Sequence, residues 1–207
     1  MEQIKLIRKS WAKVFLDLIE PLARFLINLK VSPYVLTGAG LFFSILGFNF
    51  FRIGYLFFGG LMIILAGICD VLDGRLARES NSVSKYGALI DSVVDRYSEI
   101  FLFLGLLVYF WERSLTLVIL IFLAVVGSLL VSYVRARAEG LGLECKVGIM
   151  QRQERMSYLA AGTILSPIPF MGNFLLILAL TIIAVFSNFT VIQRVVYIKN
   201  QLKEKNL

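Results

Sequence analysis

Long stretches without charge dominate this chain and decide what it can fold into. No charged side chain occurs in residues 31–51, 53–69, 114–134 or 156–193. Since an α-helix crosses a bilayer in about 20 apolar residues, each stretch is long enough for at least one crossing. Charged residues make up only 17% of the 207 residues, against 58% apolar ones, and the mean hydropathy is +0.82. The sequence therefore predicts an all-α integral membrane protein.

The chain divides into six predicted transmembrane helices. The first two spans meet at a tight turn around Arg52 and Gly54, and the third begins near Lys85 and ends at Trp111. The fourth span covers residues 114–134. The last uncharged stretch is split into two spans by a cluster of turn-forming residues, Ser166, Pro167, Pro169, Gly172 and Asn173. These helices form one predicted domain, residues 31–195, which a basic cytosolic tail, residues 196–207, follows.

Residues 1–30 have the pattern of an amphipathic helix rather than of a signal peptide. Charged side chains interrupt any continuous apolar core in this segment. Apolar residues recur at steps of three and four from Ile4 to Leu29, with basic residues between them. This spacing predicts an N-terminal amphipathic helix that lies in the membrane interface and is bent or divided at Pro21.

Lysine and arginine gather on one side of the predicted membrane. All but two of the 21 basic residues fall in the amino-terminal segment, in the connections after spans two and four, and at the carboxyl-terminal end. The opposite side keeps only Arg52 and Arg113. The positive-inside rule therefore predicts that both termini are cytosolic, and in a bacterium the protein would lie in the cell (inner) membrane.

Residue types that are missing or isolated exclude several kinds of chemistry. Histidine is absent, which removes imidazole as a base or a metal ligand. Cys69 and Cys145 stand alone, without the second thiol that zinc and redox motifs need. The formal charge of +7 matches cytosolic loops that face anionic lipid or substrate phosphates, so we expect membrane lipid and no nucleic acid as a partner.

Four aspartates interrupt the apolar pattern at helical spacing. They lie at the end of the second span and the start of the third, together with small residues and one arginine. Because the connection between these spans is short, we expect antiparallel neighbours whose acidic faces can meet near the cytosolic boundary. The residues at steps of three and four along the two helices are Asp70, Asp73, Gly74, Ala77, Arg78, Gly87, Asp91 and Asp95.

Carboxylates at membrane depth are costly, and crowded like charges make the cost higher. Divalent metal is the natural partner, and hard oxygen ligands suit Mg²⁺ or Mn²⁺, with room for two ions. A cation-conducting or transporting helix bundle is the alternative from a different class of protein. Its acids would be spread across the bilayer, whereas these four are predicted to cluster near one face.

The motif resembles the full signature of the CDP-alcohol phosphotransferase family. It consists of Asp70-x-x-Asp73-Gly74-x-x-Ala77-Arg78, eight further residues, and Gly87-xxx-Asp91-xxx-Asp95. Enzymes of this family displace CMP from a CDP-linked lipid with an alcohol, in the presence of Mg²⁺ or Mn²⁺. The resemblance implies that Asp70, Asp73, Asp91 and Asp95 bind the metal, and that Asp95 also takes the proton from the acceptor hydroxyl. It further suggests a homodimer.

The same resemblance implies contacts to the CDP-linked lipid. Residues 32–37 look like the Pro-Asn-x-x-Thr stretch that lines the family's cytidine site, except that Tyr34 stands where the family has Asn. An alternative is that Pro33 only begins a helix while Thr37 hydrogen-bonds its own backbone. The residues that the resemblance assigns to the CDP-linked lipid are Pro33, Tyr34, Thr37, Gly74, Arg78 and Ser84.

Arginines near the predicted cytosolic helix ends favour an acceptor that carries a phosphate, because a guanidinium can grip a phosphate with two hydrogen bonds. The segments around them are similar to those of phosphatidylinositol phosphate synthases, although Gln151 and Gln153 replace the Glu and Pro of the pattern Glu-Arg-Pro-Glu-Arg. The residues predicted to bind the acceptor phosphate are Arg137, Arg152, Arg155 and Arg194.

The implied reaction transfers a phosphatidyl group from CDP-diacylglycerol to a small phosphorylated alcohol. Inositol 1-phosphate is the expected acceptor, giving phosphatidylinositol phosphate and CMP. Glycerol 3-phosphate, used by phosphatidylglycerophosphate synthases, is the alternative, because it is phosphorylated too. The same arginines also satisfy the positive-inside rule and could bind lipid headgroups.

Overall fold

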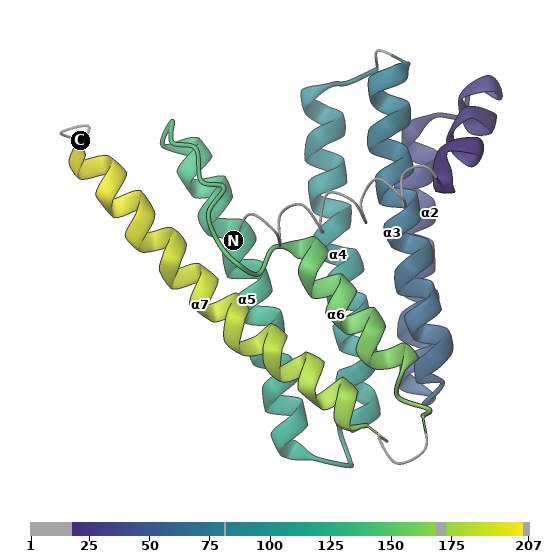
Figure 1. The fold of residues 1–207 in the computed structure, drawn as a ribbon, viewed down its shortest axis with the longest axis vertical. Helices are drawn as coiled ribbons and strands as arrows, with labels where there is room; N and C mark the ends of the chain where they lie inside the picture. Colours follow the sequence, from purple (N-terminus) through teal and green to yellow (C-terminus); the bar gives the residue numbers. More distant parts are fainter. Residues whose placement is uncertain (1–17, 81, 169–172, 205–207) are drawn as a thin grey trace.

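The chain folds into a bundle of α-helices (Figure 1). The computed structural model describes residues 18–80, 82–168 and 173–204, and none of these residues forms a strand. A helix over residues 18–28 comes first. It is followed by α2 (Pro33–Arg52), α3 (Leu56–Glu79), α4 (Lys85–Phe110), α5 (Leu115–Gly140), α6 (Arg152–Ile164) and α7 (Phe174–Glu204).

Each of the six predicted spans coincides with one of the helices α2 to α7. Among the described helices, α2, α3, α5 and α7 are long and apolar enough to cross a membrane. Helix α4 has 26 residues but carries several charges, and α6 has only 13 residues. The helical rise makes α6 about 20 Å long, less than the bilayer core of about 30 Å. The all-helical fold is thus confirmed for the described residues, with four candidate membrane spans, while the count of six crossings stays a prediction.

Short polar residues and proline define where the helices begin. Pro33 occupies the first turn of α2, where its missing N–H costs no hydrogen bond. The Ser84 hydroxyl accepts a hydrogen bond from the backbone N–H of Gly87 at 2.9 Å and so caps α4. At the start of α6, the Glu154 carboxylate accepts from the backbone N–H of Gln151 at 3.1 Å. These caps set the first turns of α4 and α6, the turns nearest the predicted site.

The helices pack in two groups that α6 and α4 connect. Helix α2 contacts both α3 and α4, and α5 contacts α7, while α6 contacts α3 and α7. Figure 1 shows α6 between α3 and the α5–α7 pair. The main apolar core joins buried residues from all six helices α2 to α7: Phe51, Ile63, Leu106, Ile121, Leu159 and Leu180.

Glycine lets α2 and α4 approach each other closely. A methyl group at Gly105 would lie 2.8 Å from the carbonyl oxygen of Phe48 and 2.9 Å from its Cα. Only a residue without a side chain fits there, as is common where helices pack in membranes. This contact holds α4, which carries half of the acidic motif, close against α2.

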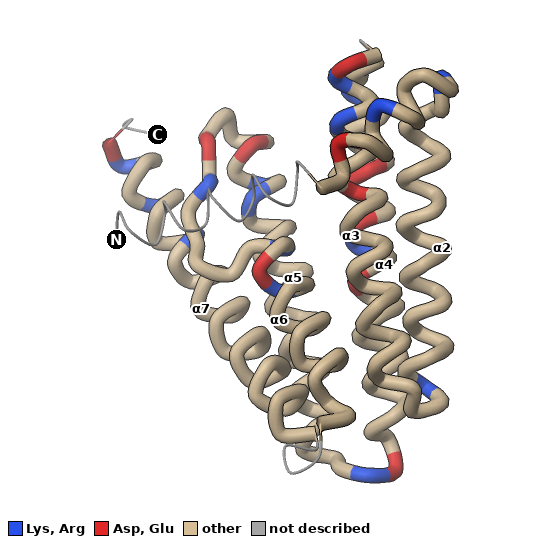
Figure 2. The backbone as a smooth tube through the Cα atoms, turned by 45° about the vertical axis from the view of Figure 1, so that its right-hand side comes forward, with Lys and Arg blue, Asp and Glu red and all other residues tan. Residues whose placement is uncertain are grey.

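Charged residues gather at one end of the bundle (Figure 2). This end holds the carboxyl ends of α3, α5 and α7 and the amino ends of α4 and α6. At the opposite end, the two described turns that join α2 to α3 and α4 to α5 hold Arg52, Glu112 and Arg113. The asymmetry agrees with the predicted distribution of basic residues.

The helix of residues 18–28 is attached to α3. Ile19 and Ala23 pack in a cluster with Leu72 of α3, and Glu20 forms an ion pair with Arg75. Hydrogen bonds from Arg24 and Arg75 hold the pKa of the Glu20 carboxyl below its usual range.

Residues 18–28 are helical without a break and pack on both sides of Pro21, so the described helix is not divided there. The alternative, a bend at Pro21, stays a prediction. The interfacial position of the helix stays a prediction. Residues 1–17 of the predicted amphipathic segment lie outside the described residues.

Replacing Gly105 with alanine should destabilise the bundle, because the added methyl group would force α2 and α4 apart. We expect a lower midpoint of thermal unfolding in detergent, equivalent to about 1–3 kcal/mol of overpacking. Gly67→Ala is the matched control, since a methyl group at Gly67 meets nothing within 4 Å. An unchanged midpoint for Gly105→Ala would contradict the close packing described above.

Candidate metal and substrate site

The four aspartates of the motif line one cavity at the charged end of the bundle. Helix α3 contributes Asp70 and Asp73, and α4 contributes Asp91 and Asp95. Thr37 of α2 also lines this cavity. The two acidic helix faces therefore meet as their spacing predicted, across a cavity that α2 closes on one side.

Three of the carboxylates are close enough to share a cation. Oxygen atoms of Asp70, Asp91 and Asp95 all lie within 4.8 Å of one another, and the three side chains are half-buried. Carboxylate oxygens are the donors that Mg²⁺ and Mn²⁺ prefer, and crowded negative charges favour a cation between them. The chemistry and spacing of these donors fit a divalent metal.

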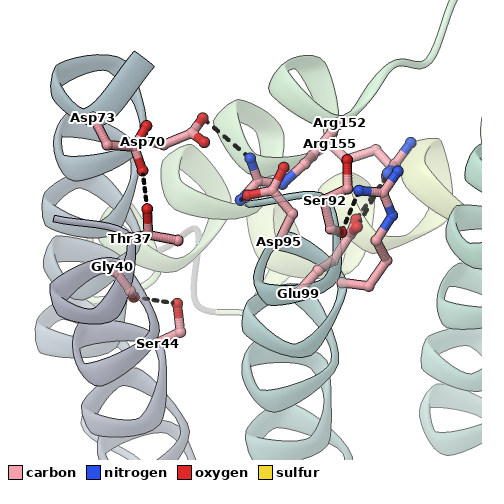
Figure 3. A network of polar contacts seen from close by, with 11 residues as sticks. Thr37, Gly40, Ser44, Asp70, Asp73, Ser92, Asp95, Glu99, Arg152 and Arg155 are labelled. Carbon is pink, nitrogen blue, oxygen red and sulfur yellow. Dashed lines mark hydrogen bonds and ion pairs between the residues drawn. The ribbon is translucent and has the colours of Figure 1, made fainter. Parts of the chain in front are cut away.

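Asp73 faces the same cavity but is bound differently. Only 6% of the residue is exposed, and its Oδ2 atom accepts a hydrogen bond from the Thr37 hydroxyl at 2.8 Å (Figure 3). The Thr37 hydroxyl also lies 3.2 Å from the carbonyl oxygen of Pro33. The Thr37 hydroxyl thus makes both contacts considered for it, one with the backbone of its own helix and one with an aspartate of the site.

Arg152 reaches into the acidic cluster from α6. Its Nη1 atom lies 3.1 Å from Oδ2 of Asp70, and its Nη2 atom lies 2.8 Å from Oδ1 of Asp95 (Figure 3). The guanidinium therefore bridges α3 and α4 and offsets part of their negative charge. Its side chain remains 27% exposed, so part of it is open to solvent or ligand.

Arg155, which was predicted to bind the acceptor phosphate, lies in the interior. Its Nε and Nη2 atoms donate to the two oxygens of Glu99 at 2.7 and 3.1 Å, and Nη1 donates to the carbonyl oxygen of Met150 at 3.2 Å. Arg155 is 0% exposed and Glu99 is 4% exposed. All three nitrogens of this guanidinium have protein partners.

Two further predicted arginines have contrasting surroundings. Arg194 is buried, and it donates from Nε to the carbonyl oxygen of Val147 at 2.9 Å and from Nη1 to that of Val131 at 2.5 Å. It thereby links α7 to α5 and to the loop before α6. Arg137 is exposed near the end of α5. The structure therefore brings Arg152 alone, of the four predicted acceptor ligands, into contact with the aspartates.

The residues predicted to contact the CDP-linked lipid form two small groups. In α3, a methyl group at Gly74 would lie 3.5 Å from Nη1 of Arg78, so the guanidinium lies beside the glycine. At the start of α4, a methyl group at Gly87 would lie 3.0 Å from Oγ of Ser84 and 3.3 Å from Oη of Tyr34. The tyrosine that departs from the family pattern thus reaches the cap of α4.

Glu99 is a buried charged residue of this region that stands outside the predicted site residues. It lies one helical turn after Asp95, on the face that Gly87, Asp91 and Asp95 define. The sequence signal for Glu99 was that this acid continues the spacing up to the uncharged part of α4. Its partner could not be read from the sequence, because Arg155 belongs to a helix far along the chain.

The fold and the site define a helical membrane protein with a carboxylate-rich cavity at one end of its bundle. A family model described as CDP-alcohol phosphatidyltransferase matches residues 30–198. The chain therefore belongs to the CDP-alcohol phosphatidyltransferase family, as its motif predicted.

Similar proteins carry more specific names. The phosphatidylinositol phosphate synthase of Mycolicibacterium smegmatis is 33% identical over 185 residues, which cover 87% of this chain and 83% of the relative. The archaetidylinositol phosphate synthase of Methanothermobacter thermautotrophicus is 36% identical over 150 residues, which cover 72% of this chain and 74% of the relative.

Crystal structures of the phosphatidylinositol phosphate synthase of Mycobacterium tuberculosis have the same fold. The structure with CDP-DAG bound matches with a TM-score of 0.79 and 34% identity, over 86% of this chain and 92% of that one. The structure in complex with manganese and citrate matches with a TM-score of 0.79 and 33% identity, over 86% and 87% of the two chains.

Replacing Asp91 with asparagine should weaken Mn²⁺ binding by about tenfold or more, because one charged donor of the cluster is lost. Electron paramagnetic resonance of free Mn²⁺ measures the affinity in detergent solution. Glu112→Gln, which removes a carboxylate at the opposite end of the bundle, is the control and should bind Mn²⁺ as the parent does. Unchanged affinity in Asp91→Asn would contradict a metal centre at these aspartates.

Proposed function

We propose that this protein transfers the phosphatidyl group of CDP-diacylglycerol to a hydroxyl of inositol 1-phosphate, giving phosphatidylinositol phosphate and CMP. The observation that carries the proposal is the contact of Arg152 with Asp70 and Asp95. The guanidinium of Arg152 is partly exposed and suited to bind a phosphate, and it contacts two carboxylates of the family motif. The names of the relatives and the CDP-DAG complex of the Mycobacterium tuberculosis enzyme support the same reaction.

We assign the metal to the motif aspartates. Asp70, Asp91 and Asp95 form the group whose oxygens lie within 4.8 Å, and Asp73 faces the same cavity. When bound there, Mg²⁺ or Mn²⁺, as two ions, would supply Lewis-acid stabilisation of the charge that develops on the phosphates. The manganese complex of the Mycobacterium tuberculosis enzyme supports this assignment without distinguishing the two metals.

The donor lipid is proposed to bind along the first turns of α2 and α4 and the last turns of α3. Arg78 beside Gly74 offers a guanidinium to the diphosphate, and the small glycine leaves space for it. Ser84, Tyr34 and Thr37, with the backbone at Pro33, are proposed to surround the cytidine. This assignment follows the family motif and the closeness of Tyr34 to the α4 cap.

Asp95 is the proposed general base. It accepts the proton of the acceptor hydroxyl as the hydroxyl oxygen attacks the β-phosphorus of CDP-diacylglycerol. The new oxygen–phosphorus bond replaces the bond to CMP, which leaves with its electron pair. Ser98 lines the cavity, but among the described residues no hydrogen bond joins it to one of these aspartates, and the chain has no histidine to activate it. We therefore propose a single displacement without a covalent enzyme intermediate.

For the acceptor phosphate, we favour Arg152 as a direct ligand, because its side chain is partly exposed and contacts the acidic cluster. Arg137 is exposed and free to contribute from the end of α5. The direct contacts predicted for Arg155 and Arg194 stay predictions, since both side chains are buried with protein partners. Glycerol 3-phosphate remains the alternative acceptor, because arginine recognises both phosphates.

We further propose six crossings, a cytosolic site and cytosolic termini in the cell membrane, with the helix of residues 18–28 at the interface. The supporting observation is that basic residues gather at the end of the bundle that carries the aspartates (Figure 2). The proposed domain spans residues 31–195, with the tail at 196–207, and a homodimer is its proposed assembly. A cation-conducting bundle is disfavoured, because the described aspartates lie at one end only.

A purified-enzyme assay tests this function. With CDP-diacylglycerol and Mg²⁺, we expect the fastest CMP release with inositol 1-phosphate, slower release with glycerol 3-phosphate, and little with free inositol. EDTA and Asp70→Asn should each abolish release, and mass spectrometry should identify phosphatidylinositol phosphate. Turnover of glycerol 3-phosphate alone would reject the acceptor but keep the reaction, and full activity in EDTA would reject the metal assignment.

Replacing Asp95 with asparagine should lower kcat by about two to four orders of magnitude, the usual contribution of a general base. Binding of CDP-diacylglycerol, measured by equilibrium dialysis, should change much less. Glu139→Gln, which alters an exposed carboxylate of α5, should leave both quantities unchanged. If turnover instead fell only as far as the loss of lipid and Mn²⁺ binding explains, and saturating Mn²⁺ restored it, Asp95 would act as a metal ligand alone and not also as the base.

A further inference from the structure

Two arginines of α6 contact two acids of α4 in matching order. Asp95 and Glu99 lie one turn apart on α4, and Arg152 and Arg155 lie one turn apart on α6. Nη2 of Arg152 lies 2.8 Å from Asp95, and Nε of Arg155 lies 2.7 Å from Glu99. The first contact is at the cavity, and the second is one turn deeper in the bundle (Figure 3).

The deeper pair is fully enclosed and fully bonded. The side chains of Arg155 and Glu99 are 1% and 5% exposed. Two nitrogens of Arg155 hold both oxygens of Glu99, and the third donates to the carbonyl oxygen of Met150. A charge in such surroundings is stable only with its partner, so neither side chain is free to move away alone.

This pair ties the amino end of α6 to α4. Helix α6 packs against α3 and α7, and the pair adds a tie to α4. The bond to Met150 holds the turn just before α6, and Arg152 is the first residue of the helix. The position of Arg152 therefore depends on a buried pair that lies one turn below it.

We propose that Glu99 is a positioning residue: by holding Arg155, it sets Arg152 between Asp70 and Asp95, and thereby sets the phosphate grip of the acceptor site. The inference rests on the proposed function, because it assigns the acceptor phosphate to Arg152. It gives Arg155 a supporting role in place of direct contact with the acceptor.

The rival arrangement has the opposite consequence for one variant. If Arg155 bound the acceptor phosphate directly, Glu99 would compete with that phosphate for the guanidinium. Glu99→Gln would then free Arg155 and lower the KM for the acceptor. If Glu99 positions the arginines, Glu99→Gln should raise the acceptor KM by about tenfold or more, since a displacement of about 1 Å in a site can cost that much. The KM for CDP-diacylglycerol should stay unchanged.

A double variant separates positioning from simple stability. Glu99→Met with Arg155→Met removes both charges, keeps the net charge and fills the interior with flexible apolar side chains. We expect its thermal midpoint to be close to that of the parent, whereas Glu99→Gln alone lowers the midpoint. The matched control is Arg135→Met with Glu139→Met, which removes an exposed ion pair of α5 and should change nothing.

Mn²⁺ binding gives a readout that needs no acceptor. With Arg152 no longer held against Asp70 and Asp95, the double variant should bind Mn²⁺ about threefold or more tightly, because less positive charge stays at those carboxylates. Its acceptor KM should nevertheless be raised by about tenfold or more. Electron paramagnetic resonance and the CMP-release assay measure the two quantities.

The outcomes distinguish this inference from the proposed function. A lower acceptor KM in Glu99→Gln would overturn the positioning role, and so would a double variant with the acceptor KM and Mn²⁺ affinity of the parent. If the parent released no CMP with any acceptor, the proposed function would fail, while the Mn²⁺ titration of the double variant would still test the hold of Glu99 on Arg152.

Discussion

Charge inside an apolar bundle is the constraint on which the rest of this structure depends. Oxygens of Asp70, Asp91 and Asp95 lie within 4.8 Å of one another, an arrangement that requires positive charge nearby. Arg152 supplies part of it from a helix that is distant in the sequence. The helices α3, α4 and α6 are therefore held together by electrostatics where they meet the site, and by apolar packing elsewhere.

The same constraint explains how the structure uses its other buried polar groups. Thr37 satisfies Asp73, the least exposed acid of the cavity, and Arg194 satisfies backbone carbonyls that would otherwise end inside the bundle. The contact of Thr37 joins α2 to α3, and the contacts of Arg194 join α7 to α5 and to the loop before α6. Because an unpaired polar group in such surroundings is costly, these contacts restrict the helices to a narrow set of positions.

The sequence predicted the helices and the acidic faces well, because both depend on local spacing. Uncharged stretches located every helix from α2 to α7 except the charged α4, and steps of three and four brought Asp70 and Asp91 to facing surfaces. The depth of the arginines could not be predicted in the same way. The rule that places Arg155 and Arg194 at cytosolic helix ends says nothing about whether their long side chains turn outward or inward. That choice depends on partners such as Glu99, which only the tertiary fold brings near.

The pairing of α4 with α6 makes the spacing between Arg152 and Arg155 more critical than the identity of most residues of α6. Gln153 stands where the family pattern has proline, yet it is exposed and the neighbouring arginines keep their spacing. Inserting or deleting one residue between Arg152 and Arg155 would instead rotate one of them by about 100° around the helix axis. Over evolution, this short segment should therefore accept substitutions on its outer face and reject any change in length.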